Sequence, residues 1–286
     1  MKQLLLFAIG FFLFSGCVKN NPQPVWLEIN NWTLNANPNS TQDPGVLTHN
    51  FSDVWVYING KVIGVFEVPC KIPVLASGSA DISLFPAINN NGISSTKKIY
   101  PFVKPYETSL SLTPGETYTI TPQTTYYDKI NFWVEDFENA ILKIEDDNEF
   151  SQVSLQVGNN SAISQWGYYG HVHLTDIDSM WVGITNQMAL PKGGAEVYME
   201  INYKVSNPVT TGLKAISTSS TTDNPLYVLK PRNNDFTWKK MYLDLRETVS
   251  YSTAAYTFQH YFKSELIDEF SEGDIYLDNI KIVYFE

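Results

Sequence analysis

The chain has 286 residues, of which 43% are hydrophobic and 14% aromatic, and its formal net charge at pH 7 is −11. The hydrophobic content supports a buried core and excludes a chain that is disordered throughout. The negative charge makes nucleic acid and anionic lipid headgroups poor partners.

The first residues have the pattern of an export signal. A basic residue precedes an apolar run from Leu4 to Phe14, and small residues follow the run up to Cys17. The run has 11 residues, whereas a membrane-spanning helix needs about 20. Residues 1–16 are therefore predicted to be a signal peptide rather than a retained transmembrane helix.

Cys17 stands at the predicted cleavage site, after the small residues Ser15 and Gly16. This arrangement resembles the lipobox of bacterial lipoproteins. The resemblance implies that the Cys17 thiol carries diacylglycerol and that the new amino terminus is acylated as well. Two or more acyl chains give stable anchoring, so we expect a protein of the cell envelope, at the outer membrane, with residues 17–24 as a tether. Periplasmic or surface exposure stays open, and a secretory signal with a chance cysteine is the alternative.

The second cysteine, Cys70, has no partner if Cys17 carries lipid, so no internal disulfide is expected. It lies in an apolar stretch. That setting favours a small buried side chain over a reactive thiol.

Residues 25–128 are predicted to form a first β-sandwich, because short alternating runs of β-branched and aromatic residues recur between turn residues. The strongest local signal is residues 53–66, two alternating strands joined by Asn59-Gly60. Both central residues of a type I′ turn need positive φ, and Asn-Gly supplies them. Residues 50–90 resemble PEGA-type and related immunoglobulin-like modules of bacterial surface proteins, which implies a small sandwich and no chemistry.

A polar segment, residues 121–128, separates this module from the remainder of the chain, and the domain boundary is predicted there. Residues 129–286 begin with an acidic and aromatic strand and end with a strand that contains Leu-Asp-Asn-Ile. These two ends resemble those of galactose-binding-like jelly rolls, which occur in many carbohydrate-binding modules. No clean helical period of 12 or more residues appears. The fold is therefore predicted to be all β, an immunoglobulin-like sandwich followed by a jelly roll.

The jelly-roll resemblance also implies a structural calcium ion near the meeting of the first and last strands. The acidic positions that match are Asp136, Glu138 and Asp278. A hard cation such as calcium takes about six to eight oxygen ligands. The alternative is that these carboxylates cap turns or pair with lysines.

A ligand-binding surface is predicted on the glycine-flanked segment 165–171. Its candidate residues are Gln165, Trp166, Tyr168 and Tyr169, with Trp181 as a second choice. Sugar binding places an aromatic ring against the apolar face of a pyranose and uses polar side chains for the hydroxyls, and this segment offers both. The alternative is that the rings belong to the core, as is predicted for Phe137 and Trp238.

Nothing in the sequence predicts an enzyme, because no nucleophile elbow, P-loop or dinucleotide fingerprint occurs. His171 and His173 share one face of a predicted strand, a spacing that metal sites use. Acidic pairs such as Glu135-Asp136 could serve a glycosidase. Packed histidines and solvated carboxylates are the alternatives.

Three functions follow from these patterns. The leading hypothesis is a membrane-anchored, non-catalytic protein that binds glycan through its jelly roll. The second is a structural or adhesive subunit of the cell envelope that contacts protein partners. The third is a metal-dependent or glycoside hydrolase.

Overall fold

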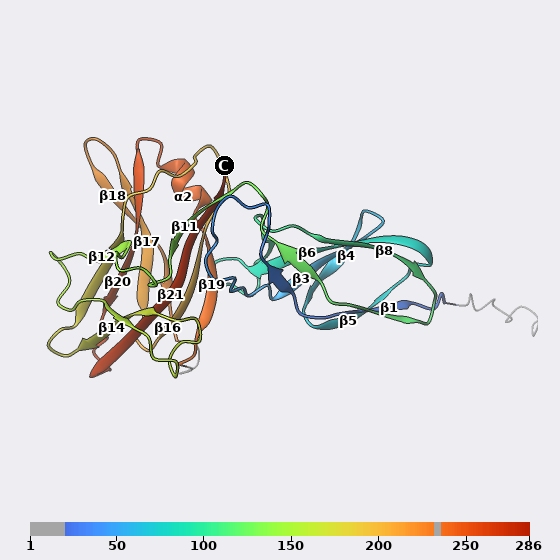
Figure 1. Cartoon of the computed structure of the whole chain (residues 1–286), viewed down its shortest axis with the longest axis horizontal. Coiled ribbons are helices and arrows are strands. Elements are labelled where there is room, and N and C mark those ends of the chain that lie inside the picture. The colour runs from blue at the N-terminus through green and yellow to red at the C-terminus, as the bar shows by residue number, and fades with distance from the viewer. Residues whose placement is uncertain (1–20, 232–235) are drawn as a thin grey trace, which may run out of the picture.

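The computed structural model describes residues 21–231 and 236–286, and these consist almost entirely of β-strands (Figure 1). The predicted all-β fold of two sandwiches is confirmed. Among the described residues the one helix is α2 (Arg246–Tyr251), and it is too short to cross a membrane. The predicted signal peptide, 1–16, and the predicted lipid site, Cys17, lie outside the described residues.

The first sandwich holds the first ten strands. They are β1 (Val25–Ile29), β2 (Thr33–Asn35), β3 (Asp53–Ile58), β4 (Lys61–Glu67), β5 (Cys70–Val74), β6 (Gly78–Asn89), β7 (Lys97–Ile99), β8 (Tyr106–Leu112), β9 (Thr117–Ile120) and β10 (Gln123–Thr125). One sheet has the order β5-β1-β9, and β10 pairs with β2. The other has the order β4-β3-β6, and β7 and β8 pair with successive parts of β6. Alternate residues of β1, namely Val25, Leu27 and Ile29, are fully buried between the sheets.

The predicted hairpin at Asn59-Gly60 is confirmed. Strands β3 and β4 pair antiparallel up to Ile58 and Lys61. Asn59 has a φ of 48° and Gly60 a φ of 74°, as a type I′ turn requires. Cys70 begins β5, half-buried and without a disulfide. Burial raises the pKa of its thiol, in keeping with an unreactive side chain.

The second sandwich holds the remaining strands. They are β11 (Ile130–Glu135), β12 (Ile144–Asp146), β13 (Gln156–Gly158), β14 (Tyr169–Thr175), β15 (Met180–Thr185), β16 (Val197–Val205), β17 (Val209–Ile216), β18 (Thr221–Leu229), β19 (Lys239–Asp244), β20 (Thr257–Glu265) and β21 (Glu272–Phe285). One sheet, here called the β21 sheet, has the order β13-β14-β21-β16-β19, with β11 also paired to β21. The other has the order β12-β15-β20-β17-β18. The predicted boundary at residue 128 falls between β10 and β11.

Strand β16 is buried on both faces, which explains its nearly continuous burial. Its inner face supplies Met199 and Ile201 to the core between the two sheets of the second sandwich. On the outer face, Tyr198 packs into the core of the first sandwich, and Glu200 is fully buried. The outer face of the β21 sheet is therefore partly covered by the first sandwich.

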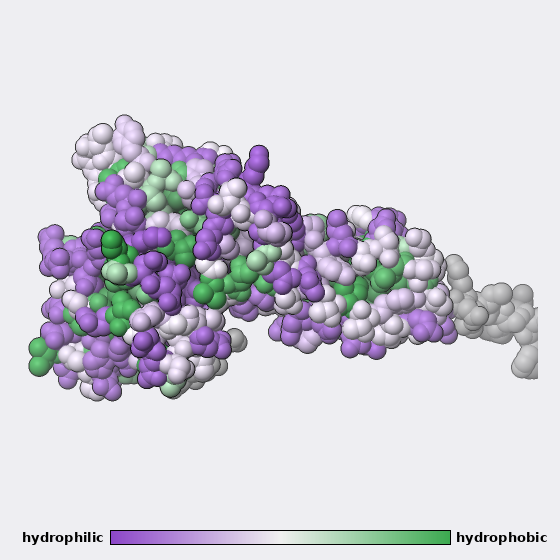
Figure 2. Space-filling model, in the orientation of Figure 1, coloured by the Kyte–Doolittle hydropathy of each residue, from purple (hydrophilic) through white to green (hydrophobic). Residues whose placement is uncertain are grey.

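The two sandwiches lie end to end, and β19 is on the side of the second sandwich that faces the first (Figure 1). Asn90 forms a parallel bridge with Tyr242, and Asn91 N donates to Tyr242 O at 2.9 Å. Lys98 reaches across to Glu196 at 3.2 Å. In the space-filling view, a narrower waist joins the two sandwiches, and hydrophobic residues form small patches between hydrophilic ones (Figure 2).

A buried ion pair closes this junction. Glu200 Oε2 lies 2.7 Å from Lys240 Nζ, and both side chains are almost fully buried. Tyr100 and Tyr126 of the first sandwich donate their hydroxyls to Glu200 Oε1 at 2.6 and 2.7 Å. Burial alone would raise the pKa of Glu200, but Lys240 and Lys281 hold it below its usual value. Because every member is paired, the junction is a fixed contact between the sandwiches.

Candidate functional site

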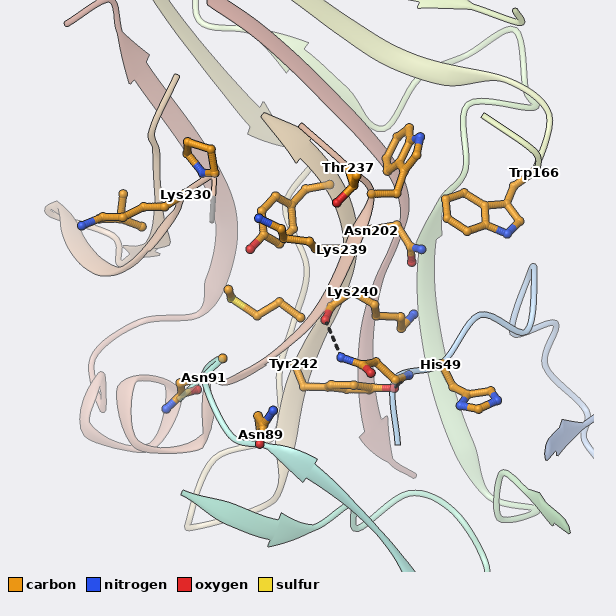
Figure 3. A pocket seen from close by; sticks show the side chains of 17 residues that line it. His49, Asn89, Asn91, Trp166, Asn202, Lys230, Thr237, Lys239, Lys240 and Tyr242 are labelled. Carbon is orange, nitrogen blue, oxygen red and sulfur yellow. Dashed lines mark hydrogen bonds between the residues drawn. The ribbon is translucent and has the colours of Figure 1, made fainter. Parts of the chain in front are cut away.

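A cavity of ≈ 820 Å³ opens on the outer face of the β21 sheet, next to the junction (Figure 3). The first sandwich contributes His49, Asn91 and, at the end of β6, Asn89. The second sandwich contributes β19, part of β16 and the loop that carries Trp166. Neither sandwich alone forms this cavity, and none of the described residues that line it is acidic.

A network of hydrogen bonds positions the polar side chains at the cavity. Lys240 Nζ donates to Thr48 Oγ1 at 2.9 Å, and that hydroxyl donates to Asn202 Oδ1 at 2.9 Å. Asn50 N donates to the Tyr242 hydroxyl at 2.9 Å, and its side-chain amide to Lys240 O at 3.4 Å (Figure 3). These contacts cross from one sandwich to the other, so folding itself sets the shape of the cavity.

One acceptor at the cavity has no partner in the described part of the chain. Asn89 Oδ1 is buried and makes no hydrogen bond there. A buried polar atom without a partner costs about 1–3 kcal/mol. A hydroxyl of a bound ligand is one group that can supply the missing donor.

Two tryptophans stand together at the opposite side of the cavity. The Trp166 and Trp238 rings meet edge to face with centroids 5.4 Å apart, and both are half-buried. The Trp238 indole N–H donates to Ile163 O, and Trp166 N donates to Ser164 Oγ at 3.1 Å. Both side chains are thus held while part of each ring stays accessible. The prediction that Trp238 belongs to the core is wrong, because strand alternation places it on the outer face with Lys240 and Tyr242.

The two tryptophans belong to a row of rings that crosses the outer face of the β21 sheet. Tyr276 lies opposite His171 of β14, and the two rings stack with centroids 4.3 Å apart. On its other side Tyr276 lies opposite Lys204 of β16, whose ammonium nitrogen is 4.6 Å from the Phe236 ring centroid. Trp238, just before β19, is 6.5 Å from Tyr276. We call Trp166, Trp238, Phe236, Tyr276 and His171 the aromatic row.

The aromatic row runs across four adjacent strands rather than along one of them. Neighbouring strands are about 4.8 Å apart, so the row extends for about 14 Å from β14 to β19. Phe236 is 38% exposed, and it and its neighbours cover Tyr276, which is 8% exposed. Flat apolar rings in line beside an amide-lined cavity suit a ligand that has apolar faces and polar edges.

Of the predicted ligand residues, the structure brings Trp166 to the cavity. Gln165 and Tyr168 are exposed on the same loop, and neither lines the cavity. The prediction for Tyr169 is wrong, because its side chain is only 4% exposed and packs edge to face on Tyr276.

The prediction for Trp181 is also wrong. Its ring is fully buried in the core of the second sandwich, beside Phe262. The indole N–H donates to Asp146 Oδ1 at 2.8 Å. Phe137 is in the same core, as predicted. Trp181 is therefore a packing residue that has no access to a ligand.

Several cavity residues were not predicted from the sequence. His49 and Asn89 belong to the first sandwich, whereas Asn202 and Lys240 belong to the second. One signal was available, the polar turn sequence Asn-Asn-Asn-Gly at residues 89–92, which is unusual directly after a buried strand.

Two of the three carboxylates predicted as calcium ligands hold the loop that carries Trp166, and the third, Asp136, accepts a hydrogen bond from Glu138 N at 3.3 Å. Ser164 Oγ donates to Asp278 Oδ2 at 3.3 Å, and Tyr168 N donates to Glu138 Oε1 at 2.7 Å. Burial raises the pKa of Asp278 to about 7, and the charges of Asp136 and Glu138 add to the effect. The three carboxylates are thus near neighbours with mutual repulsion.

The donor chemistry at this place fits a calcium ion. Asp278 makes no ion pair within the described part of the chain, and both amide atoms of the adjacent Asn279 are buried without hydrogen-bond partners. The oxygens of Asp136, Glu138 and Asp278 do not all lie within 4.8 Å of one another, so calcium would have to draw them together.

The acidic pair Glu135-Asp136 does not form a catalytic dyad in a cleft. Glu135 is only 2% exposed. Its Oε1 accepts the backbone N–H of Phe137 at 2.8 Å, and its other oxygen accepts that of Lys143. This carboxylate therefore caps a turn after β11.

No family model matches the chain, and no curated protein matches its sequence. The xylan-binding domain CBM22-2 of Paenibacillus barcinonensis Xyn10C is similar in structure, with 12% identity and a TM-score of 0.40 over 54% of this chain and 99% of that domain. A family 11 carbohydrate-binding module of Clostridium thermocellum, in complex with a mixed-linked tetrasaccharide, has 16% identity and a TM-score of 0.38 over 54% of this chain and 95% of that module.

Two further matches are parts of larger chains. The chain spans 19% of a tailspike protein of bacteriophage CBA120, at 11% identity and a TM-score of 0.35. It spans 28% of a two-module xylanase chain of Clostridium thermocellum, at 9% identity and a TM-score of 0.39.

Proposed function

We propose that this chain is a lipid-anchored extracytoplasmic protein that binds glycan in the cavity between its two sandwiches and along the aromatic row. The observation that carries the proposal is the aromatic row itself, which ends at a cavity lined by amides. A pyranose offers an apolar face to a ring and hydroxyls to amides, so one ligand class satisfies both surfaces.

The polar groups at the cavity suit sugar hydroxyls. Asn50, Asn89, Asn91 and Asn202 each carry a donor and an acceptor, and a hydroxyl can serve as either. Several of these amides are fixed by contacts across the junction, which lowers the entropy lost on binding. Asn89 Oδ1 gains a partner when a hydroxyl binds.

The residues that line the cavity support glycan binding without catalysis. Glycoside hydrolysis ordinarily uses two carboxyl groups that flank the scissile bond. The described cavity lining contains none, and Glu200 beneath it is engaged with Lys240 and two tyrosines.

The proposed lipid on Cys17 would place the cavity away from the membrane. Strand β1 begins at the end of the first sandwich that lies away from the second (Figure 1). The first sandwich would then act as a spacer between an outer-membrane anchor and the ligand. In a Cys17→Ser variant, the protein is expected to move from the membrane fraction to the soluble fraction; unchanged fractionation contradicts the anchor.

The proposal includes a structural calcium ion held by Asp136, Glu138 and Asp278. Its positive charge would offset the repulsion among these carboxylates and so stabilise the loop that carries Trp166. Removal of calcium with a chelator is expected to lower the melting temperature of the wild type. An unchanged melting temperature removes calcium from the proposal.

A glycan array probed with the purified protein tests the proposed function. Trp166→Ala is expected to weaken binding of the retained glycans by about five- to thirty-fold, as for an aromatic anchor worth about 1–2 kcal/mol. Trp26→Ala is the matched control, because Trp26 is a half-buried tryptophan on β1, far from the cavity. No retained glycan, or equal losses in the two variants, contradicts the proposal.

A second candidate, contact with a protein partner, is favoured by edge strand β4. Val62, Ile63 and Val65 are 54%, 41% and 37% exposed there, and an exposed apolar edge strand can pair with another chain. Light scattering of the wild type and of Val62→Lys tests contact through β4. A wild-type oligomer that becomes a monomer in Val62→Lys favours protein contact. A wild type and a variant that are both monomeric count against self-association.

A further inference from the structure

Two histidines and an aspartate converge on strands β14 and β21, outside the cavity. His171 and His173 project from the same face of β14, because alternate residues of a strand point the same way. The antiparallel register places Asp274 of β21 opposite His173. Asp274 Oδ1 lies 2.8 Å from His171 Nε2 and 3.0 Å from His173 Nδ1. Within the described part of the chain, this is the one group of three such residues whose ligand atoms all lie within 4.8 Å of one another.

The cluster is on the outer face of the β21 sheet, where solvent can reach it. Val172 and Leu174 alternate with the two histidines along β14, and both are buried in the core of the second sandwich. The histidines therefore point away from that core. The side chains of His171 and Asp274 are each 29% exposed, and that of His173 is 43% exposed. An ion from solution can thus enter without any rearrangement of the sheet.

Neighbouring contacts already hold two members of the cluster. The ring of His171 stacks on Tyr276, with an interplanar angle of 5° and centroids 4.3 Å apart. The backbone of Asp274 is tied to Ser206, because Asp274 N donates to Ser206 Oγ at 2.8 Å and Ser206 N donates to Asp274 O at 2.9 Å. Side chains that are fixed before the ligand arrives lose little entropy on binding.

The geometry points to a binding site for a divalent transition-metal ion, such as Zn²⁺, at His171, His173 and Asp274. Two imidazoles and a carboxylate suit zinc, nickel or copper, whereas calcium takes oxygen ligands. Zinc bound tetrahedrally at about 2.1 Å keeps neighbouring ligand atoms about 3.3 Å apart. The two N–O distances of 2.8 and 3.0 Å are a little shorter, so the ion has only to widen them slightly. Water completes the coordination at these exposed side chains.

The hydrogen bonds of the cluster change when the ion enters. Without an ion, His171 Nε2 and His173 Nδ1 each donate to the Asp274 carboxylate. Zinc takes the lone pair of a neutral imidazole, so the proton of each ring then resides on its other nitrogen. For His173 this is Nε2, which lies 4.0 Å from Glu272 Oε2. A carboxylate near the second nitrogen of a metal-bound histidine favours that tautomer.

Calorimetric titration of the untagged full-length protein with ZnCl₂ tests this site, and it needs no glycan, so its outcome is independent of the proposed function. One ion is expected to bind per chain. His173→Ala and Asp274→Asn, which each remove a ligand, are expected to weaken zinc binding at least tenfold. Asp223→Asn, which removes an exposed carboxylate on β18, is the control and is expected to leave the affinity unchanged. Circular dichroism checks that each variant is folded.

The titration overturns the inference if no zinc binds, if several weak sites appear, or if either ligand variant loses less affinity than the tenfold expected. An equal loss in Asp223→Asn also overturns it, because the effect would then be one of general charge.

Competition with calcium separates this site from the one proposed at Asp278. Excess CaCl₂ is expected to leave the zinc affinity unchanged, because nitrogen ligands do not suit a hard cation. Loss of zinc binding in calcium overturns the assignment to a transition metal. Co²⁺ gives a second readout, since its visible absorption reports its ligands. An absorption band is expected with the wild type and not with His173→Ala, and equal spectra of the two overturn the inference.

Discussion

The outer face of the β21 sheet has two ends that differ sharply. At the sealed end, the first sandwich covers Tyr198, Glu200 and Tyr242, and every polar group of the Glu200 cluster is paired. At the open end, the cavity and the rings of Trp166, Trp238 and Phe236 are accessible to solvent, and Asn89 Oδ1 lacks a partner in the described chain. One sheet face therefore serves as a domain contact at one end and as a candidate binding surface at the other.

The largest expected effect is at the sealed end. Lys240→Met leaves the Glu200 carboxylate buried without its cation, which is expected to lower the free energy of unfolding by about 3–5 kcal/mol. Urea denaturation followed by circular dichroism measures this. The matched control is Lys214→Met. Lys214 Nζ lies 3.5 Å from Asp223 Oδ1, and Asp223 is 57% exposed, so loss of this ion pair should cost no more than about 1 kcal/mol. Equal losses would contradict the sealed junction.

A smaller effect is expected in the loop that joins the carboxylates to Trp166. Gly167 has a φ of +108°, and a Cβ there would collide with the Glu138 carboxylate. Gly167→Ala is expected to cost about 1–3 kcal/mol through strain and to weaken glycan binding although residue 167 does not line the cavity. Gly193→Ala, at φ +73° with open space around it, is the control for the strain alone. Unchanged glycan affinity in Gly167→Ala would show that the loop does not position Trp166.

A dependence of stability on pH is also expected at Asp278. Its pKa of about 7 in the folded protein exceeds its ordinary value of 3.8. At a pH below 3.8 the Asp278 carboxyl is protonated in both the folded and the unfolded state. As the pH rises from about 4 to 7, the carboxyl ionises in the unfolded state but stays protonated in the folded state, so the free energy of unfolding falls. Without calcium, wild type should lose stability relative to Asp278→Asn over this range, as measured by urea denaturation. A constant difference would contradict the raised pKa.

The raised pKa of Asp278 also predicts the pH range in which calcium stabilises the protein. Because calcium binds the ionised carboxylate, a chelator should lower the melting temperature of wild type more at pH 8 than at pH 5. Asp278→Asn should show a much smaller response at both values. A chelator effect that is equal at the two pH values would argue against binding at Asp278.

Features that depend on local chemistry could be predicted from the sequence. Asn59-Gly60 sets its own turn, because few other residue pairs adopt two successive positive φ angles. The alternation of apolar and polar residues predicted the fold class, because it too is a local property of each strand. Trp166 was predicted because glycines and polar residues mark its segment as a loop.

Features that depend on distant contacts could not be predicted. Trp181 lies in β15 and Trp238 directly precedes β19, yet one is in the core and the other lines the cavity. Alternation separates the two faces of a strand without saying which face is outward. Here the outward face is itself half covered, so Glu200 and Tyr198 are as buried as core residues. The cavity joins His49 to Lys240, and no local pattern links residues so far apart.

The most direct test of the central claim is a crystal structure of the protein with the oligosaccharide that the glycan array selects. The account predicts sugar rings against Trp166 and Trp238, with hydroxyls bonded to Asn89 and Asn202. Sugar bound elsewhere, with this cavity free of it, would contradict the account.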